Sequence, residues 1–355
     1  MITQNYTVTE PMTTLNITVT NSSSATPPKS SASLGIAILS IAFIIGFPGN
    51  AFVIWTILTR MKKRTVTCIL ILHLAMADII VILTAPFFLH LLSSGRWIFG
   101  EIICKMCHYI GCLSMYASIY LITFMSMDRF LAVAKPYMSQ KIRTKLAARI
   151  IVLVVWVQAA LLAIPTPVYR TVKTERNRSN CITIQDPVHG GFQHLAFQYT
   201  FETMMGFVIP FTIIVSCYVY VGLRLRTVKF QTKHKTSRLV IMILVTFALF
   251  WIPYHVVNII EVSGELSSSK KLKNAALIAR PNATALAFLS SSINPILYVF
   301  AGGNFIRTAG LGFMAKLFEA TGSEAGSLKK VSQVFQQMSR KQTSEVGKLN
   351  ELTEQ

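Results

Sequence analysis

The sequence predicts an all-α membrane protein: a seven-transmembrane helix bundle followed by a short amphipathic eighth helix on the inner leaflet. Hydrophobic residues make up 52% of the chain and charged residues only 14%, and the mean hydropathy is +0.52. Soluble domains contain about 25% charged residues. Seven apolar segments, each long enough to cross a bilayer core of roughly 30 Å as a helix, alternate with polar or basic stretches.

The seven apolar segments divide the chain from residue 34 to residue 301. Each exceeds the roughly 20 residues that a helix needs to cross a membrane. We expect the polar stretches between them to form loops on alternating sides of the bilayer. The segments cover residues 34–58, 66–92, 104–134, 146–169, 195–223, 239–262 and 275–301.

Basic residues indicate which side of the membrane each loop faces. The formal net charge of +20 would also suit a nucleic-acid-binding protein, so the distribution of the charge matters. Residues 59–65 contain four Lys or Arg, residues 135–149 five and residues 224–238 six, without any Asp or Glu. Because cytoplasmic loops are enriched in Lys and Arg, these loops are predicted to face the cytoplasm. We therefore expect a multi-pass plasma-membrane protein with an extracellular amino terminus.

The two ends of the chain are polar. Residues 1–33 lack the charged start and apolar run of a cleaved signal peptide, and are predicted to form a glycosylated extracellular tail. Residues 34–302 form the predicted transmembrane domain, residues 303–320 the amphipathic cytoplasmic helix, and residues 321–355 a disordered tail with Ser and Thr for kinases. The acceptor sequons on the predicted outer side begin at Asn5, Asn16, Asn21 and Asn177.

Two of the six cysteines are placed on the predicted outer side, where conditions are oxidising. Cys104 lies at the top of the third segment, and Cys181 lies in the loop between the fourth and fifth segments. We predict a disulfide between them, which would pin this loop across the mouth of the bundle. Cys107, one helical turn below Cys104, is the alternative partner.

Several strongly polar residues lie inside apolar segments, where an unpaired polar group costs several kcal/mol. Asp78 is the most telling, because a carboxylate at this depth needs a cation or hydrogen-bond donors to stay charged. We predict a hydrated pocket of the size of a cation beside it. The alternative is that these groups only join helices through hydrogen bonds. The set comprises Asn50, Asp78, Ser118, Ser290, Ser291 and Asn294.

Asp128 and Arg129 stand at the inner end of the third segment, after an uncharged run over residues 110–127. We expect Asp128 to hold the arginine by a local ion pair. The alternative is an ordinary interfacial arginine whose side chain extends to the lipid headgroups. Charge alone favours this alternative.

Ionisable and aromatic residues gather at the predicted outer ends of the segments. His108 and Tyr116 are separated by about 12 Å along a helix. Arg170, Arg280 and His108 are placed so that they can converge on one anion, with Glu202 pairing with one of them. The alternative for each residue is solvation at the rim. The candidates are His108, Tyr116, Arg170, Glu202, Tyr254, His255 and Arg280.

Six short motifs stand in order on six of the segments. They are Gly49-Asn50, Leu74-Ala75-Met76-Ala77-Asp78, Asp128-Arg129-Phe130, Trp156, Phe250-Trp251-Ile252-Pro253 and Asn294-Pro295-Ile296-Leu297-Tyr298. Together they resemble the motifs of the rhodopsin-like G-protein-coupled receptors, over nearly all of residues 34–317. The resemblance implies a receptor that changes shape to signal, and not an enzyme.

The resemblance also implies an activation switch. It places a packing switch at Ile119, Pro210 and Phe247, on three different helices, and makes Tyr218 and Tyr298 the inner tyrosines that Arg129 meets when the cytoplasmic face opens. Since Lys233 stands where some relatives have an acid, resting Arg129 is expected to depend on Asp128 and on packing.

The cation pocket is then expected to bind a sodium ion, an allosteric modulator that favours the closed form. The residues assigned to it are Asp78, Ser118, Trp251 and Asn294. No other cofactor is expected.

Within this class, five stretches are similar to the leukotriene B4 receptors, most of all to their high-affinity type: LTAPFFLHLL, CHYIGCLSMYAS, FWIPYHVVN, ALAFLSSSINPILY and GLGFMAKLFEATGSEA. The similarity implies a lipid agonist, leukotriene B4 or a related hydroxylated fatty acid, bound by the outer candidates. It further implies signalling in chemotaxis and inflammation through a heterotrimeric G protein of the inhibitory type, with receptor kinases and arrestin acting at the tail.

Two alternatives stay open. A receptor for a chemoattractant peptide would present the same arginines to a free carboxylate. A transporter or channel is the alternative from another class, and the absence of sequence repeats argues against it.

Overall fold

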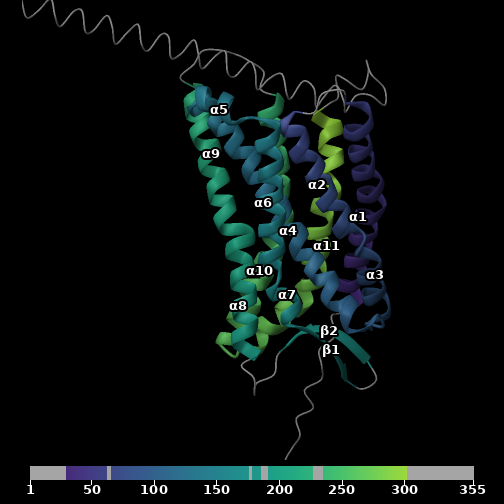
Figure 1. Cartoon of the computed structure of the whole chain (residues 1–355). Helices are drawn as coiled ribbons and strands as arrows, with labels where there is room; N and C mark the ends of the chain where they lie inside the picture. Colours follow the sequence, from purple (N-terminus) through teal and green to yellow (C-terminus); the bar gives the residue numbers. More distant parts are fainter. Residues whose placement is uncertain (1–28, 62–64, 176–177, 185–190, 227–234, 302–355) are drawn as a thin grey trace, which may run out of the picture.

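Long helices stand side by side in a bundle, with a two-stranded hairpin across one end and the short helix α5 (Pro136–Ile142) at the other (Figure 1). The computed structural model describes residues 29–301 apart from four gaps, residues 62–64, 176–177, 185–190 and 227–234. The predicted eighth helix at 303–320, both predicted tails beyond the described range and the sequons at Asn5, Asn16, Asn21 and Asn177 lie outside the described residues. They stay predictions.

Each predicted apolar segment corresponds to one helix or to a run of consecutive helices. The helices are α1 (Lys29–Trp55) with η1 (Thr56–Arg60), α2 (Val66–Ile82) with α3 (Ala85–Ser94), α4 (Gly100–Ala134), α6 (Lys145–Ala163) with α7 (Pro165–Val168), α8 (Gly191–Thr203) with η3 (Met204–Val208) and α9 (Ile209–Arg226), α10 (Lys235–Leu266) and α11 (Lys270–Ala301).

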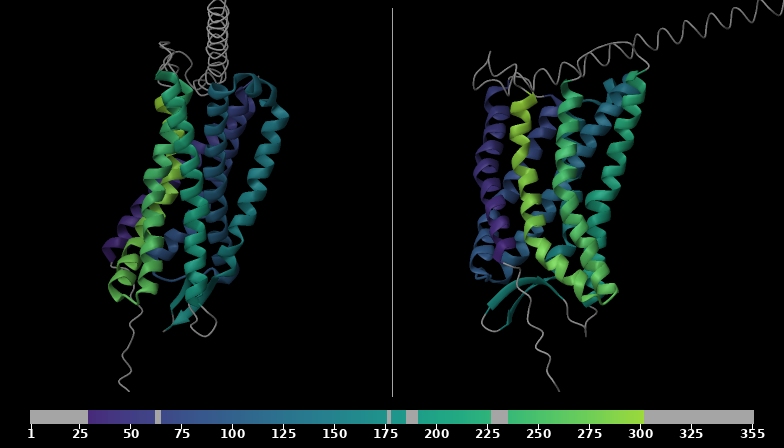
Figure 2. Two further views of the ribbon diagram at one scale, coloured as in Figure 1. Left: turned by 90° about the vertical axis from the view of Figure 1, so that its left-hand side faces the viewer. Right: turned by 180° about the vertical axis from the view of Figure 1, so that it is seen from behind.

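Six of these helical runs are long and apolar enough to cross a membrane, as judged over the described residues. The seventh, α11, is more polar because it carries Lys270, Lys271, Lys273 and Arg280 near its beginning. It nevertheless packs along α1 and α10, and the view from behind in Figure 2 shows these three helices as neighbours. The predicted seven-helix bundle is therefore confirmed.

Prolines explain why three of the segments are divided. Proline lacks an N–H group, and its ring clashes with the carbonyl four residues earlier. Pro86 and Pro165 accordingly stand at the beginnings of α3 and α7. Pro210 follows the π-helical turn η3, in which Gly206 lies four residues before it. The widened turn is tied to α4, because the Tyr120 hydroxyl donates to the Met205 carbonyl over 3.0 Å.

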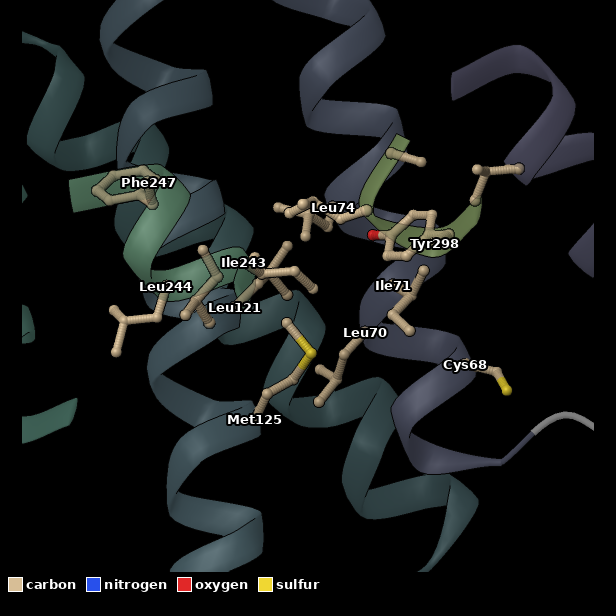
Figure 3. Close-up of a cluster of buried hydrophobic side chains, with 14 of the residues drawn as sticks. Cys68, Leu70, Ile71, Leu74, Leu121, Met125, Ile243, Leu244, Phe247 and Tyr298 are labelled. Atoms are coloured by element: carbon tan, nitrogen blue, oxygen red, sulfur yellow. The ribbon is translucent and has the colours of Figure 1, made fainter. Parts of the chain in front are cut away.

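The largest group of buried apolar side chains joins α2, α4, α10 and α11 toward the inner end of the bundle. Figure 3 shows part of this group. Met125 of α4 and Ile243 of α10 belong to it. Tyr298 of α11 is fully buried, and its ring lies beside Leu74 and Ile71 of α2 (Figure 3). Residues from distant parts of the sequence therefore hold the inner half together.

Helices α1 and α11 approach each other closely at two glycines. A Cβ atom at Gly49 would lie 2.9 Å from the ring of Pro295, which is too close for an ordinary contact. A Cβ atom at Gly46 would clash with Ser292. The Asn50 amide donates to the carbonyls of Gly46 and Ser291, over 3.0 Å in each case. The Gly49-Asn50 motif therefore serves the contact between the first and seventh helices.

The hairpin at the end of the bundle was not predicted. Strands β1 (Arg170–Glu175) and β2 (Arg178–Thr183) pair antiparallel, with Arg170 opposite Thr183. Their β-branched residues favour extended structure, although the strands are short and polar. The hairpin places Arg170 beside the helices, at the beginning of β1.

A disulfide holds the hairpin against α4. Cys104 and Cys181 are bonded, with their Cα atoms 5.8 Å apart, so the predicted pairing is confirmed and Cys107 is not the partner. A hydrogen bond of 2.7 Å from the Trp97 N–H to the Ser179 carbonyl adds a second attachment. The hairpin is therefore fixed to the loop before α4 and to α4 itself.

A candidate ligand site and a candidate switch in the bundle

The seven outer candidates come from five elements near the hairpin. His108 and Tyr116 lie on α4, Arg170 begins β1, Glu202 lies on α8, Tyr254 and His255 lie on α10, and Arg280 lies on α11. They are far apart in the sequence, but electrostatic interactions and ring contacts connect all of them. The structure therefore brings the predicted set together in one region.

Glu202 is the buried acid at the centre of this region, with 3% of its surface exposed. It accepts hydrogen bonds from the Tyr254 hydroxyl and from the thiol of Cys112. Arg170 and Arg280 both interact with it electrostatically. Its position agrees with the expectation that an acid accompanies the two arginines, although neither arginine makes a direct ion pair with it among the described contacts.

The direct partner of Arg280 is a different acid. Its guanidinium pairs with the carboxylate of Glu261 and donates to the side-chain carbonyl of Asn258. It also lies over the rings of Tyr199 and Tyr254, at 4.8 and 5.6 Å from their centroids. The side chains of Arg280 and Glu261 remain 23% and 21% exposed. Arg280 therefore lies in the predicted region, but its guanidinium is already paired with the Glu261 carboxylate.

Sequence reasoning missed Glu261, Asn258 and Tyr199. A signal was available for the first two, because residues spaced three and four apart share one face of a helix. Asn258 lies four residues after Tyr254 on α10, and Glu261 follows three residues later. Tyr199, on α8, gave no such signal.

His108 faces the disulfide and the hairpin. Its Nδ1 atom lies 2.9 Å from the Cys104 carbonyl, and its ring packs edge-on against Phe88 at 5.4 Å. Because a carbonyl only accepts hydrogen bonds, Nδ1 carries the proton and Nε2 of a neutral ring is left as an acceptor. Arg170 interacts with this ring electrostatically. His108 and Arg170 therefore form a second polar group beside Glu202.

Tyr116 and His255 lie deeper in the bundle. Tyr116 is 1% exposed, packs among small residues of α6 and interacts with Glu202. His255 is 3% exposed, and its Nδ1 atom lies 3.2 Å from the Thr203 hydroxyl. Its ring centroid is 6.0 Å from that of Trp251. These two residues connect the outer polar region to the middle of the bundle.

Four buried polar atoms in this region have no hydrogen-bond partner among the described residues. Buried polar groups are normally paired, so such a cluster indicates a binding site. Two of the atoms are donors, one is a carboxylate oxygen and one is a histidine nitrogen. They are Arg170 Nε, Asn258 Nδ2, Glu202 Oε2 and His255 Nε2. The arrangement suits a ligand that has both an anionic group and hydroxyl groups.

Asp78 lines a small cavity in the middle of the bundle. The Asn294 amide donates to its carboxylate over 2.8 Å, and Ser291 also hydrogen-bonds to it. This cavity has room for about one water molecule or one small ion. Ser118 and Trp251 line it too, and the Ser118 hydroxyl is buried without a partner among the described residues. A carboxylate with nearby hydroxyls fits a hard cation, whereas the Trp251 indole can only line the space.

Arg129 is buried at the inner end of α4, with 1% of its surface exposed. Its Nη2 atom lies 3.8 Å from Asp128 and donates to the Thr67 hydroxyl over 2.7 Å. Arg143, just after α5, lies 3.1 Å from Asp128 and also donates to Thr67, over 3.2 Å. The expected contact between Asp128 and Arg129 is present, but a second arginine shares both of its partners.

Sequence reasoning missed Thr67 and Arg143. Neither belongs to the third segment, and nothing in the spacing of the sequence links them to Asp128. The burial of Arg129 also differs from the alternative in which this side chain extends to lipid headgroups.

The predicted switch residues lie between the two polar regions. Ile119 and Phe247 are both buried in the large apolar cluster, and the Phe247 ring stacks on Trp251 with centroids 5.6 Å apart. Pro210 is buried directly after the widened turn η3. These residues join the cavity at Asp78 to the outer end of α10.

The two inner tyrosines have different surroundings. Tyr218 lies near Ser126 and interacts electrostatically with Arg129, and its buried hydroxyl has no hydrogen-bond partner among the described residues. Tyr298 is fully buried and interacts with Asp78. One tyrosine therefore stands beside the inner arginine and the other beside the central acid.

Comparison with known proteins places this geometry in context. The profile of the 7 transmembrane receptors (rhodopsin family) matches residues 49–298. The chain is 48% identical to leukotriene B4 receptor 1 of Homo sapiens over 316 residues, which cover 87% of this chain and 89% of the relative. It is 38% identical to leukotriene B4 receptor 2 of Homo sapiens over 307 residues, 84% of each chain. It is 32% identical to the C3a anaphylatoxin chemotactic receptor of Oncorhynchus mykiss over 301 residues, 83% of this chain and 81% of the relative.

Proposed function

Because the chain belongs to the rhodopsin family of seven-transmembrane receptors, we propose that it is a plasma-membrane receptor for leukotriene B4 or a closely related hydroxylated fatty acid, with its amino terminus outside. The relatives named for leukotriene B4 are 48% and 38% identical to it over 316 and 307 aligned residues. Family membership agrees with the expectation that the chain is not an enzyme.

The observation that carries the proposal is the group of buried, unpaired polar atoms beside two arginines. A hydroxylated fatty acid offers a carboxylate to a guanidinium, and hydroxyls that both donate and accept hydrogen bonds. Glu202 Oε2 and the histidine nitrogens suit the hydroxyls. Arg170 and Arg280 suit the carboxylate. The aromatic and apolar neighbours suit the hydrocarbon chain.

We propose that the receptor signals by an equilibrium between closed and open cytoplasmic faces. The buried Arg129, held by Asp128 and Thr67, supports a closed arrangement in the described structure. An agonist shifts the equilibrium only if it binds the open form more tightly. Packing around Ile119, Phe247 and Trp251 would carry this preference inward, and Arg129 would then exchange its partners for Tyr218 and Tyr298.

The partners on the inner side follow from the same proposal. The opened face would accept the carboxyl-terminal helix of a heterotrimeric G protein, of the inhibitory type, against the basic inner loops. Receptor kinases and arrestin would act on the tail at 321–355.

We further propose sodium as the modulator at Asp78. The paired carboxylate, the unpaired Ser118 hydroxyl and the size of the cavity support this assignment. Asp78 and Ser118 would hold the ion, Asn294 would orient the carboxylate, and Trp251 would close the cavity. A bound cation supplies the positive charge that keeps the Asp78 carboxylate ionised.

A second candidate ligand is a chemoattractant peptide with a free carboxylate, because the chain also resembles an anaphylatoxin receptor. Binding of labelled leukotriene B4 to membranes that contain the full chain separates the two. We expect saturable binding that short peptides do not displace and that Arg170→Ala or Arg280→Ala weakens strongly. Displacement by peptides, with no specific binding of the lipid, would favour the second candidate.

A further inference from the structure

One of the two guanidiniums proposed to meet a ligand carboxylate, that of Arg280, is already bound by an acid of the chain itself. Arg280 pairs with Glu261 and is flanked by the rings of Tyr199 and Tyr254. The carboxylate of an incoming ligand therefore meets an Arg280 guanidinium that is already in an ion pair. It must share Arg280 with Glu261 or replace it.

Glu261 differs from Glu202 in its access to water. Glu202 is 3% exposed and held by Tyr254 and Cys112, whereas 21% of the Glu261 side chain is exposed. A carboxylate that leaves an ion pair must be solvated again, because an isolated buried charge is costly. Glu261 meets this condition near the outer end of α10, and Glu202 does not.

The formal charges of the outer region point the same way. Two arginines, Arg170 and Arg280, stand with two acids, Glu202 and Glu261, so the four charges cancel. A ligand carboxylate adds one negative charge to this balanced group. Moving Glu261 out into water restores the balance, and it also removes a like charge from beside the ligand.

The side chain of Asn258 favours the ligand carboxylate over Glu261 at this site. Its carbonyl accepts from Arg280, but its buried Nδ2 atom has no partner among the described residues. Glu261 therefore accepts a hydrogen bond from Arg280 but none from the neighbouring Asn258 amide. A carboxylate placed between the two groups would accept from both, and it would satisfy a donor that is otherwise left unpaired.

We propose that Glu261 is an internal competitor for the ligand carboxylate: it holds Arg280 in the unliganded receptor and is displaced when an anionic lipid binds. The inference rests on the proposed function. Glu261 is thus a residue that sets affinity and specificity without belonging to the final complex. A neutral ligand, such as the methyl ester of the same lipid, does not require the exchange.

The test measures competition against labelled leukotriene B4 on membranes that contain the full-length receptor. The acid and its methyl ester compete for binding to the wild type and to Glu261→Gln. We expect the affinity for the acid to rise about tenfold in the variant, within the usual range of coupling between linked contacts. The affinity for the ester is expected to change less than about twofold.

The chain contains a matched control. Glu265 lies one helical turn beyond Glu261 on α10 and pairs with Lys273 over 2.6 Å. Glu265→Gln makes the same change of charge on the same helix and breaks an ion pair to the same partner helix, but it does not touch Arg280. It is expected to leave both affinities unchanged. In an Arg280→Ala background, Glu261→Gln should also lose its effect.

One outcome would contradict the proposal separately from the proposed function. Wild-type binding of the lipid with an unchanged or lower affinity for the acid in Glu261→Gln would show that Glu261 orients Arg280 instead of competing for it. Glu261→Asp, which keeps the charge on a shorter side chain, should give an intermediate gain and carries the test if Glu261→Gln does not reach the surface. If the wild type binds no leukotriene B4 at all, the proposed function fails and this inference falls with it.

Discussion

The outer and inner ends of the bundle each contain an arginine held by an acid, but the two arginines are held differently. Arg280 is partly exposed and contacts an acid that can reach water, next to unpaired polar atoms. Arg129 is covered, and shares both Asp128 and the Thr67 hydroxyl with a second arginine. The outer ion pair is thus accessible to a small molecule, whereas the inner one can change only if the helices around it move.

The comparison indicates that an ion pair between an arginine and an acid can have two roles, and that its burial decides which one. At the outer end a diffusing carboxylate can replace the acid, so the change is one of binding. At the inner end the proposed replacement groups are tyrosines of the same chain, so the proposed change is one of conformation.

The largest effect is expected from the inner arginine. Arg129→Ala should reduce agonist-stimulated nucleotide exchange on the G protein by at least about 50-fold, because it removes the group that the opened face presents. Binding of labelled leukotriene B4 should stay within about threefold of the wild type. Arg280→Ala should give the reverse pattern, with binding lost first. If Arg129→Ala abolished binding as well, the two ends would not be separate in the sense described.

Thr67→Val removes the hydroxyl that accepts from Arg129 over 2.7 Å and keeps the shape of the side chain. A hydrogen bond to a charged group contributes about 1.5–3 kcal/mol, so the closed form should be weakened and basal nucleotide exchange should rise about tenfold. Thr59→Val, which removes an exposed hydroxyl bonded within its own helix, serves as the control. Unchanged basal activity in Thr67→Val would mean that packing alone holds Arg129.

Asp78 lies between the two ends, and its variant tests how they communicate. If sodium favours the closed form, replacing sodium by a large organic cation should raise agonist affinity about fivefold in the wild type. Asp78→Asn should abolish this dependence, because the amide cannot hold the cation. Equal sensitivity to sodium in both proteins would remove the cation site from the scheme.

The smallest effect is expected from Arg143. This side chain shares Asp128 and Thr67 with Arg129, at 3.1 and 3.2 Å from Arg143, so Arg143→Gln should leave both partners to Arg129 alone. Because isolated ion pairs near a surface contribute about 0–1 kcal/mol, basal nucleotide exchange should fall by only about twofold. A rise in basal activity would show that Arg143 supports the closed form instead of competing within it.

The sequence predicted the helices and the disulfide well because their signals are local or tied to the topology. Apolar length marks each helix, and the basic loops place Cys104 and Cys181 on the same side. The hairpin from Arg170 to Thr183 escaped prediction because its strands are short, polar and supported by contacts with the helices. Its disulfide and its attachment at Trp97 come from outside the hairpin.

The candidate sites show the same limit. His108, Glu202 and Arg280 were found because ionisable groups at the ends of apolar segments are unusual. Glu261 was overlooked although its spacing from Tyr254 on α10 put it within reach. Arg143 and Thr67 could not be found in this way, because they approach Asp128 and Arg129 from another loop and another helix, and only the packing of the bundle brings them together.

The close approach of α1 and α11 has a mechanical consequence. At Gly49 and Gly46 the two backbones leave no room for even one methyl group against Pro295 and Ser292. Two helices without clearance between them cannot slide past each other, and α1 and α11 therefore act as a fixed frame. In the proposed opening that uncovers Arg129, we therefore expect helices outside this pair to move while α1 and α11 keep their contact.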